Sequence, residues 1–323
     1  MKTITYWKAI NEALDEMMQK DPAVFVMGED VAIYGGAYGV TRGLYEKYGE
    51  ERVRDTAISE AAIVGAGIGA AMTGMRPVVE IMYVDFMGIA MDQLNNQAAK
   101  VRYMFGGKTT VPLVIRTEGG AGRTLGAHHS QSLEAWFMHI PGIKVVMPAT
   151  PYDAKGLLKQ AILDNNPVVY IEHKMLYGTK GEIPEEDYLV PIGEADVKRK
   201  GKDITLISYS RMLLQTLDAA KELEKEGIDA EVVDLPTLLP LDIKTISDSV
   251  KKTRKVLIVE EDCKTAGAGA EIGMQIMESC FDYLDAPVTR LAGEDVPMPK
   301  SPVLENLAIP NKDRIIKKVK ELI

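Results

Sequence analysis

The sequence has few cysteines, no long apolar run and no excess of positive charge, and each of these absences excludes a class of protein. Its two cysteines, Cys263 and Cys280, provide no disulfide framework, which is typical of a reducing compartment. No stretch approaches the roughly 18 uninterrupted apolar residues that a membrane-spanning helix needs. The N-terminus also lacks a charged-then-apolar signal segment and an Arg-rich transit peptide. We therefore predict a cytoplasmic protein that does not associate with membranes.

The charge balance argues against nucleic acid as a partner. The formal net charge is -9 at pH 7, whereas phosphate binding needs a basic face. The short basic cluster at 198–200 is typical of a solvated turn. With 323 residues, the chain exceeds what one hydrophobic core usually serves, so we expect two domains.

Apolar patterns along the first 180 residues predict alternating strands and helices. Thr5 caps an amphipathic helix that ends at Asp21, and a short buried strand follows at 24–27. The later segments continue the alternation, with strands at 78–83, 112–116, 144–147 and 168–172 and helices at 60–74, 86–102, 133–139 and 152–163. Residues 119–126 are expected to form a flexible loop. This order predicts an α/β domain whose mostly parallel sheet is covered on both faces.

A second, smaller α/β domain is expected at 203–323, after a linker at 181–202 that is rich in Pro, Gly and charge. The first domain then comprises residues 1–180. Strands of the second domain are predicted at 204–209, 231–235, 256–260 and 288–292, and helices at 213–226, 268–278 and 312–322.

The densest glycine pattern, GAGIGAA at 65–71, superficially resembles a dinucleotide-binding loop. The glycine spacing differs from G-x-G-x-x-G, and no clean hydrophobic strand precedes it. Small residues along a helix, which allow another helix to approach closely, explain the pattern better.

Glu60 stands at the start of this Gly/Ala-rich helix and is followed by apolar residues. A carboxyl group in apolar surroundings has a raised pKa and can share a proton with a ligand nitrogen. The alternative is an ordinary helix-start Glu that faces water and is stabilised by the helix dipole. Spacing alone favours this alternative.

The second candidate site is His128-His129-Ser130, directly after the Gly-rich loop. Adjacent His residues are expected to point apart, and no C-x-x-C or H-E-x-x-H spacing supports zinc. A His after a mobile loop suits general acid/base chemistry, whereas Ser130 lacks a nucleophile elbow. From the residues alone, a site and an ordinary loop are equally open. His139 and His173 are interpreted as structural.

Taken together, several blocks resemble beta subunits of the thiamine-diphosphate-dependent component of 2-oxo-acid and acetoin dehydrogenase complexes. The telling blocks are VFVMGEDVAIYGGAYGVTRGL, DTAISEAAIVGAGIGAAMTGMRPVVEIMYVDF, DQLNNQAAKVRYMFGG, HHSQSLEAWFMHIPGIKVVMPATPYDAKGLL and AILDNNPVVYIEHKMLYG. The resemblance covers essentially the whole chain. It implies a pyrimidine-binding thiamine fold followed by a transketolase-type C-terminal α/β domain.

The resemblance also implies cofactor-binding residues in the first domain. The Glu of the I-S-E block, Glu60, would hold the aminopyrimidine ring nitrogen and so promote formation of the nucleophilic ylide. Ile58 of the same block would contact the cofactor. Met82 and Phe86 would pack and stack on the pyrimidine ring, although plain core packing would also explain both.

Two further assignments follow from the resemblance. The His of the H-S-Q block, His129, would handle protons and position the lipoyl arm; His128 departs from the Gln or Tyr usual in the family. A structural potassium ion would be held by residues around 161–166, with an ordinary helix C-terminal turn as the alternative. The residues implied are Leu113, Ala161, Ile162, Asp164 and Asn166.

The resemblance further implies a partner. Thiamine enzymes bind the diphosphate through Mg2+ with a G-D-G motif, and this chain contains none. The diphosphate half would therefore lie on an alpha subunit, in a heterotetramer of two alpha and two beta chains. This assembly would pass an acyl unit to a lipoyl acyltransferase core.

For the small-molecule substrate, blocks such as NNQAAKVRYMFGGK and TPYDAKGLLKQAI favour acetoin over pyruvate, and a branched-chain 2-oxo acid is less favoured. Two rival hypotheses are a catalytically silent assembly subunit and a self-contained transketolase-like enzyme. The retained Glu60 and His129 argue against the first. The chain length and the missing diphosphate motif argue against the second.

Overall fold

The computed structural model describes residues 1–323, which form two compact units. The first unit contains residues 1–119, 136–146 and 150–192, and the second contains 120–135, 147–149 and 193–323. Residues 120–135 lie in the middle of the predicted first domain, but they pack with the second unit. None of the helices combines the length and the apolar character needed to cross a bilayer.

The first unit is built on a parallel sheet with the strand order β6-β7-β5-β4-β2-β3. Strands β2, β5 and β7 are buried along their whole length, as expected for a parallel sheet covered on both faces. The predicted α/β architecture is thus confirmed for this unit. The strand bounds are Val24–Gly28 (β2), Val53–Asp55 (β3), Arg76–Ile81 (β4), Val114–Gly119 (β5), Lys144–Val146 (β6) and Val168–His173 (β7).

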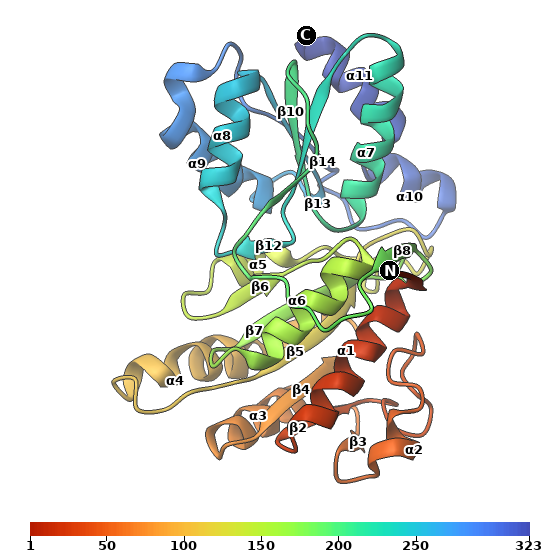
Figure 1. The fold of residues 1–323 in the computed structure, drawn as a ribbon, viewed down its shortest axis with the longest axis vertical. Helices are drawn as coiled ribbons and strands as arrows, with labels where there is room; N and C mark the ends of the chain where they lie inside the picture. The colour runs from red at the N-terminus through yellow and green to blue at the C-terminus, as the bar shows by residue number, and fades with distance from the viewer. The chain divides into compact units, whose positions relative to one another are not determined.

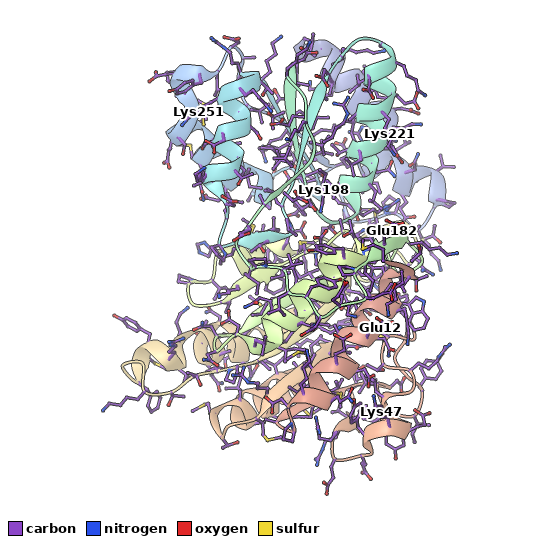
Figure 2. The ribbon with its side chains drawn as sticks, viewed as in Figure 1. Glu12, Lys47, Glu182, Lys198, Lys221 and Lys251 are labelled. Atoms are coloured by element: carbon purple, nitrogen blue, oxygen red, sulfur yellow. The ribbon has the colours of Figure 1, made fainter.

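Helices α1 (Tyr6–Lys20) and α6 (Pro151–Leu163) pack against each other beside the strands (Figure 1). Glu12 of α1, labelled in Figure 2, accepts hydrogen bonds from Lys155 of α6 at 3.0 Å and from Lys2 at 2.9 Å. Lys2 belongs to β1 (Lys2–Thr5), which pairs antiparallel with β8 (Lys180–Ile183). The start of the predicted linker is therefore a strand of the first unit.

Helix α3 (Glu60–Met72) packs on β4 through its apolar face. A Cβ atom at Gly67 would lie 2.8 Å from Val79 Cγ1 and 3.0 Å from Leu113 Cδ1, so only glycine allows this close approach. The small residues of α3 thus permit close packing, as predicted, but at Gly67 the neighbour is the sheet rather than another helix.

The predicted helix at 86–102 is interrupted. A 3-10 segment, η1 (Val84–Ala90), is followed by a π-helical segment, η2 (Gln93–Ala98), and by the short helix α4 (Ala99–Met104). Two other short helices in the chain are α2 (Leu44–Tyr48) and α5 (Glu134–Met138).

The second unit has a sheet of order β14-β13-β10-β11-β9, parallel except for β9. Helices α7 and α11 pack together beside this sheet, as do α8 and α9 (Figure 1). Strand β9 lies in the predicted linker, and helices α8 and α10 were not predicted. The bounds are Asp196–Arg199 (β9), Ile204–Ser208 (β10), Ala230–Asp234 (β11), Thr237–Leu239 (β12), Val256–Cys263 (β13), Thr289–Gly293 (β14), Ser210–Lys225 (α7), Ile243–Thr253 (α8), Ala268–Cys280 (α9), Phe281–Tyr283 (η3), Pro302–Ala308 (α10) and Lys312–Leu322 (α11).

Candidate active site

The predicted cofactor residues of the first unit gather at the carboxyl ends of neighbouring parallel strands. Glu60 follows β3 at the first position of α3, and Met82 and Phe86 follow β4. Strands β3 and β4 both pair with β2, so their carboxyl ends lie at one edge of the sheet. Ligands of open α/β sheets bind at this edge.

Glu60 is buried, with 6% of its surface exposed, so it is not a solvated helix-start residue. Glu29, which directly follows β2, is its electrostatic neighbour. Burial raises the pKa of Glu29, and the nearby charges of Glu60, Asp30 and Glu80 raise it further. The Oε1 atom of Glu29 is buried and has no hydrogen-bond partner. The protonated form of Glu29 is therefore favoured beside Glu60.

The other predicted cofactor contacts differ in exposure. Met82 and Phe86 are half-buried, so part of each side chain remains available to a ligand. Ile58, two residues before Glu60, is 80% exposed. Within this chain alone, Ile58 therefore has no apolar surroundings.

A buried ion network crosses the sheet behind these residues. Arg116 on β5 is 1% exposed and donates to Glu80 on β4 at 2.5 Å and to both carboxylate oxygens of Glu172 on β7 at 2.5 and 2.9 Å. Tyr177 donates its hydroxyl to Glu172 at 2.7 Å. Burial raises the pKa of Glu80, and the two carboxylates raise that of Arg116 far above its ordinary value. The network fixes three central strands to one another at the end where Glu60 lies.

Glu118, two residues beyond Arg116, is 1% exposed. Burial raises its pKa well above the ordinary value, and the charges of Glu80 and Glu172 add to this effect. Its Oε1 atom has no hydrogen-bond partner. Burial at the carboxyl end of β5 therefore favours the protonated form of Glu118.

Four of the predicted potassium ligands, Ala161, Ile162, Asp164 and Asn166, lie at the end of α6 and in the turn after it. Arg76 donates to the carbonyl oxygens of Ile162 at 2.9 Å and Asp164 at 3.1 Å, and Lys144 donates to the Asp164 carboxylate. Although burial alone would raise the pKa of Asp164, hydrogen bonds from Lys144 and Asn166 hold it below its ordinary value. The turn thus has cations of its own, and this arrangement favours the helix C-terminal turn. Potassium binding there stays a prediction for the five residues Leu113, Ala161, Ile162, Asp164 and Asn166.

The His pair lies in the second unit, after a loop whose amides are bound by carboxylates. His128 is exposed and His129 is half-buried. Their ring centroids are 4.4 Å apart at 58°, so the expectation that the two rings point apart was wrong. The backbone amide of His129 donates to the carbonyl of Gly126, which closes the turn beneath the two rings.

Three carboxyl groups of the second unit are buried near one another, and Arg290 lies 3.9 Å from one of them, Glu260. Glu134, Glu260 and Asp262 are 1%, 0% and 6% exposed, respectively. Burial raises the pKa of Glu134 to about 8 and that of Glu260 and Asp262 to about 7, and the charges of neighbouring carboxylates contribute. Tyr209 donates to Glu134 at 2.9 Å, and the Gly269 amide donates to Glu260 at 2.6 Å.

Sequence reasoning missed most of these buried charges. Glu29 directly follows β2, at the carboxyl end of a strand that the sequence patterns did predict. Glu80, Arg116 and Glu172 occur within otherwise apolar strands. A charge inside a strand that is buried on both faces must be paired, and this was the signal that could have revealed the network.

The chain can be compared with known proteins on this basis. Family profiles match residues 2–180 to the transketolase pyrimidine binding domain and residues 193–315 to the transketolase C-terminal domain. A solved structure described as a split gene transketolase, an inactive beta4 tetramer, superposes with a TM-score of 0.82 at 23% identity, covering 99% of this chain and 98% of that one. This likeness concerns the fold, and the predicted two-part fold class is confirmed.

Two relatives are similar over nearly their whole length. The pyruvate dehydrogenase E1 component subunit beta of Porphyra purpurea is 53% identical over 323 residues, covering 100% of this chain and 98% of the relative. The acetoin:2,6-dichlorophenolindophenol oxidoreductase subunit beta of Cupriavidus necator is 49% identical over 317 residues, covering 95% and 94%. The chain therefore belongs to the family of beta subunits of thiamine-dependent 2-oxo-acid and acetoin dehydrogenase components.

Proposed function

We propose that the chain is the beta subunit of a thiamine-diphosphate-dependent component that cleaves acetoin and passes the acetyl unit to a lipoyl group on an acyltransferase. The observation that carries the proposal is the buried Glu60 beside Glu29 at the carboxyl edge of the sheet. We infer the class of reaction from family membership. We infer acetoin as the substrate from the sequence blocks that resemble acetoin enzymes.

The residues at this edge fit a protonated ring nitrogen. Glu29 has a buried oxygen without a partner, and its pKa is raised by burial and by Glu60. When bound, thiamine diphosphate supplies the carbon nucleophile and the electron sink for carbon–carbon cleavage. Glu60 would hold a proton at the pyrimidine nitrogen. Met82 and Phe86, with Ile58, would hold the ring in place.

The second unit contributes His129 as the proposed proton-transfer and acceptor-positioning group. An imidazole titrates near neutral pH, and partial exposure leaves it accessible to an incoming group. His128 lies against it and is exposed, so it is placed to influence which acceptor or substrate is preferred.

The proposal includes an alpha subunit that binds the diphosphate and Mg2+, in an assembly of two alpha and two beta chains. The absence of a G-D-G motif supports this division. The exposed Ile58 beside the buried Glu60 also supports it, because a partner surface would give this side chain apolar surroundings.

Pyruvate is the second candidate substrate, and one observation favours it. The relative named for pyruvate dehydrogenase is 53% identical, whereas the relative named for acetoin is 49% identical. Both substrates deliver the same two-carbon acyl unit, so the roles of Glu60 and His129 remain as proposed in either case.

The test is dye-coupled turnover. The chain is co-expressed with its alpha subunit, supplied with thiamine diphosphate and Mg2+, and compared on acetoin, pyruvate and branched-chain 2-oxo acids. We expect the fastest turnover with acetoin. Faster turnover with pyruvate would replace the substrate, and no turnover of any substrate would favour a catalytically silent assembly subunit.

Glu60→Gln tests the catalytic assignment in the same complex. Loss of the ionisable proton should lower kcat by about 100-fold or more. The alpha–beta assembly should survive, as judged by size-exclusion chromatography, because Gln has nearly the same size. Full activity in Glu60→Gln would exclude Glu60 from proton transfer.

A further inference from the structure

The loop that precedes the His pair contains four glycines between 119 and 126, a composition that favours mobility. Its backbone nevertheless follows a regular pattern of left-handed residues. The φ angles of Gly120, Gly122, Thr124 and Gly126 are 84°, 104°, 54° and 89°. Alternating backbone handedness makes successive N–H groups converge on an anion. Because Thr124 has a side chain, its left-handed conformation persists only where the surroundings hold it.

Two buried carboxylates occupy the place where these N–H groups converge. Glu305 of α10, 4% exposed, accepts hydrogen bonds from the amides of Gly122 at 2.8 Å and Thr124 at 3.2 Å. Glu261 of β13, 7% exposed, accepts from the amide of Ala121 at 2.5 Å. Three amides within four residues are thus bound by carboxylates about 140 and 180 residues later in the sequence.

A third group completes the attachment. Arg211 donates to the carbonyl of Ala121 at 3.0 Å and lies 3.7 Å from the Glu261 carboxylate. Ala121 is therefore bound through its N–H by one side chain and through its carbonyl oxygen by another. The backbone of the loop expected to be flexible is thus held by several side chains, and it leads directly to His128 and His129.

Apolar packing alone does not account for the attachment of α10, because the face opposite Glu305 is exposed. Val303, Leu304 and Leu307 are 69%, 52% and 62% exposed, and only Glu305 and Ala308 of the helix are buried. The buried carboxylate therefore gives α10 a polar attachment to the loop, in a helix that buries little apolar surface.

We propose that Glu305 is a positioning residue for the His-bearing loop, acting with Glu261 as a two-carboxylate clamp on residues 121–124. The clamp holds the backbone that orients His128 and His129. The effect of the clamp on acyl transfer rests on the proposed function, whereas the existence of the clamp does not depend on that function. Charge-assisted hydrogen bonds of this kind are about twice as strong as neutral ones, so loss of the Glu305 charge should loosen the loop.

The experiment compares Glu305→Gln and Glu305→Ala with the wild type, each assembled with the alpha subunit. Gln keeps the size and one acceptor oxygen and guards against a folding defect in the Ala variant. The matched control is Glu278→Gln, which neutralises an exposed carboxylate on α9. Hydrogen exchange of the amides at 121–124 is measured first. Exchange should become at least about tenfold faster in Glu305→Ala, less so in Glu305→Gln, and not at all in the control.

The second readout is kinetic. With lipoamide as acceptor, the KM for lipoamide should rise about tenfold in Glu305→Ala, because a misplaced His pair no longer positions the acceptor. Unchanged exchange at 121–124 in both variants would overturn the clamp. Faster exchange with an unchanged KM for lipoamide would overturn the positioning role. A wild-type complex without any turnover would refute the proposed function, and the exchange result alone would then decide the clamp.

Discussion

Two clusters of buried carboxyl groups, one in each unit, differ in how closely a cation approaches them. In the first unit, Arg116 lies between Glu80 and Glu172, so the carboxylates are paired with a cation. In the second unit, Glu134 and Glu260 face Tyr209 and backbone amides, and Arg290 comes no closer to Glu260 than 3.9 Å.

The difference shows two ways in which a protein can bury carboxyl groups. A guanidinium that donates to two buried carboxylates offsets part of the cost of burying their charges, and Arg stays protonated at any physiological pH. In the second cluster the nearest guanidinium is 3.9 Å away, and burial raises the pKa values to about 7 and 8. The first cluster holds three strands together, and the second is expected to titrate near neutral pH.

Arg116→Met should have the largest effect of any single change in this comparison. It leaves two buried carboxylates without a cation and should lower the free energy of unfolding by about 3–5 kcal/mol, measured by urea denaturation. Adding Glu80→Gln should recover part of the loss. Lys221→Met, at an exposed position labelled in Figure 2, serves as the control and should change little. A loss no larger than that of the control would show that the network does not stabilise the sheet.

Glu134→Gln should change the pH dependence of stability. The folded-state pKa of Glu134 is about 8 and its ordinary value is 4.5, so only the folded chain holds this proton between these pH values. The stabilisation is complete below about pH 4.5 and is lost as pH rises through about 8, at about 1.4 kcal/mol per pH unit. Between pH 7 and 8, the unfolding free energy of Glu134→Gln should therefore fall less steeply than that of the wild type. Parallel curves would contradict a protonated Glu134.

A matched pair of tyrosine variants compares the two clusters through one hydrogen bond in each. Tyr177 donates to a carboxylate of the ion network, and Tyr209 donates to Glu134, which is protonated at pH 6. Tyr177→Phe should cost about 1.5–3 kcal/mol, and Tyr209→Phe about 0.5–1.5 kcal/mol, because a charged acceptor makes the stronger bond. The measurement is urea denaturation at pH 6. Equal losses would remove the distinction between the two clusters.

The sequence patterns predicted the elements that carry their own apolar signal. Strands β2 and β7 are short apolar runs bounded by Gly, Asp or Pro, and both were found where expected. Strands β8 and β9 carry no such run and gain their structure only by pairing with β1 and β11. Helix α8 did have a signal, because Asp242 caps it by accepting from Thr245.

The candidate site divides in the same way. Glu60 was identifiable because it starts a helix rich in Gly and Ala, and its burial in the structure excludes the alternative that it faces water. Glu305 was not identifiable, since nothing local links it to Gly122, 183 positions earlier. Contacts between residues so far apart in the sequence depend on the tertiary fold, which local residue patterns do not reveal.

The assignment of residues 120–135 to the second unit limits how these proteins can be recombined. A chimera joined at 192/193 would take its His-bearing loop from one parent and the carboxylates that bind it from the other. A chimera that exchanges the C-terminal part must therefore exchange residues 120–135 as well. The part that can be exchanged as a whole is a set of separate segments rather than one continuous stretch of sequence.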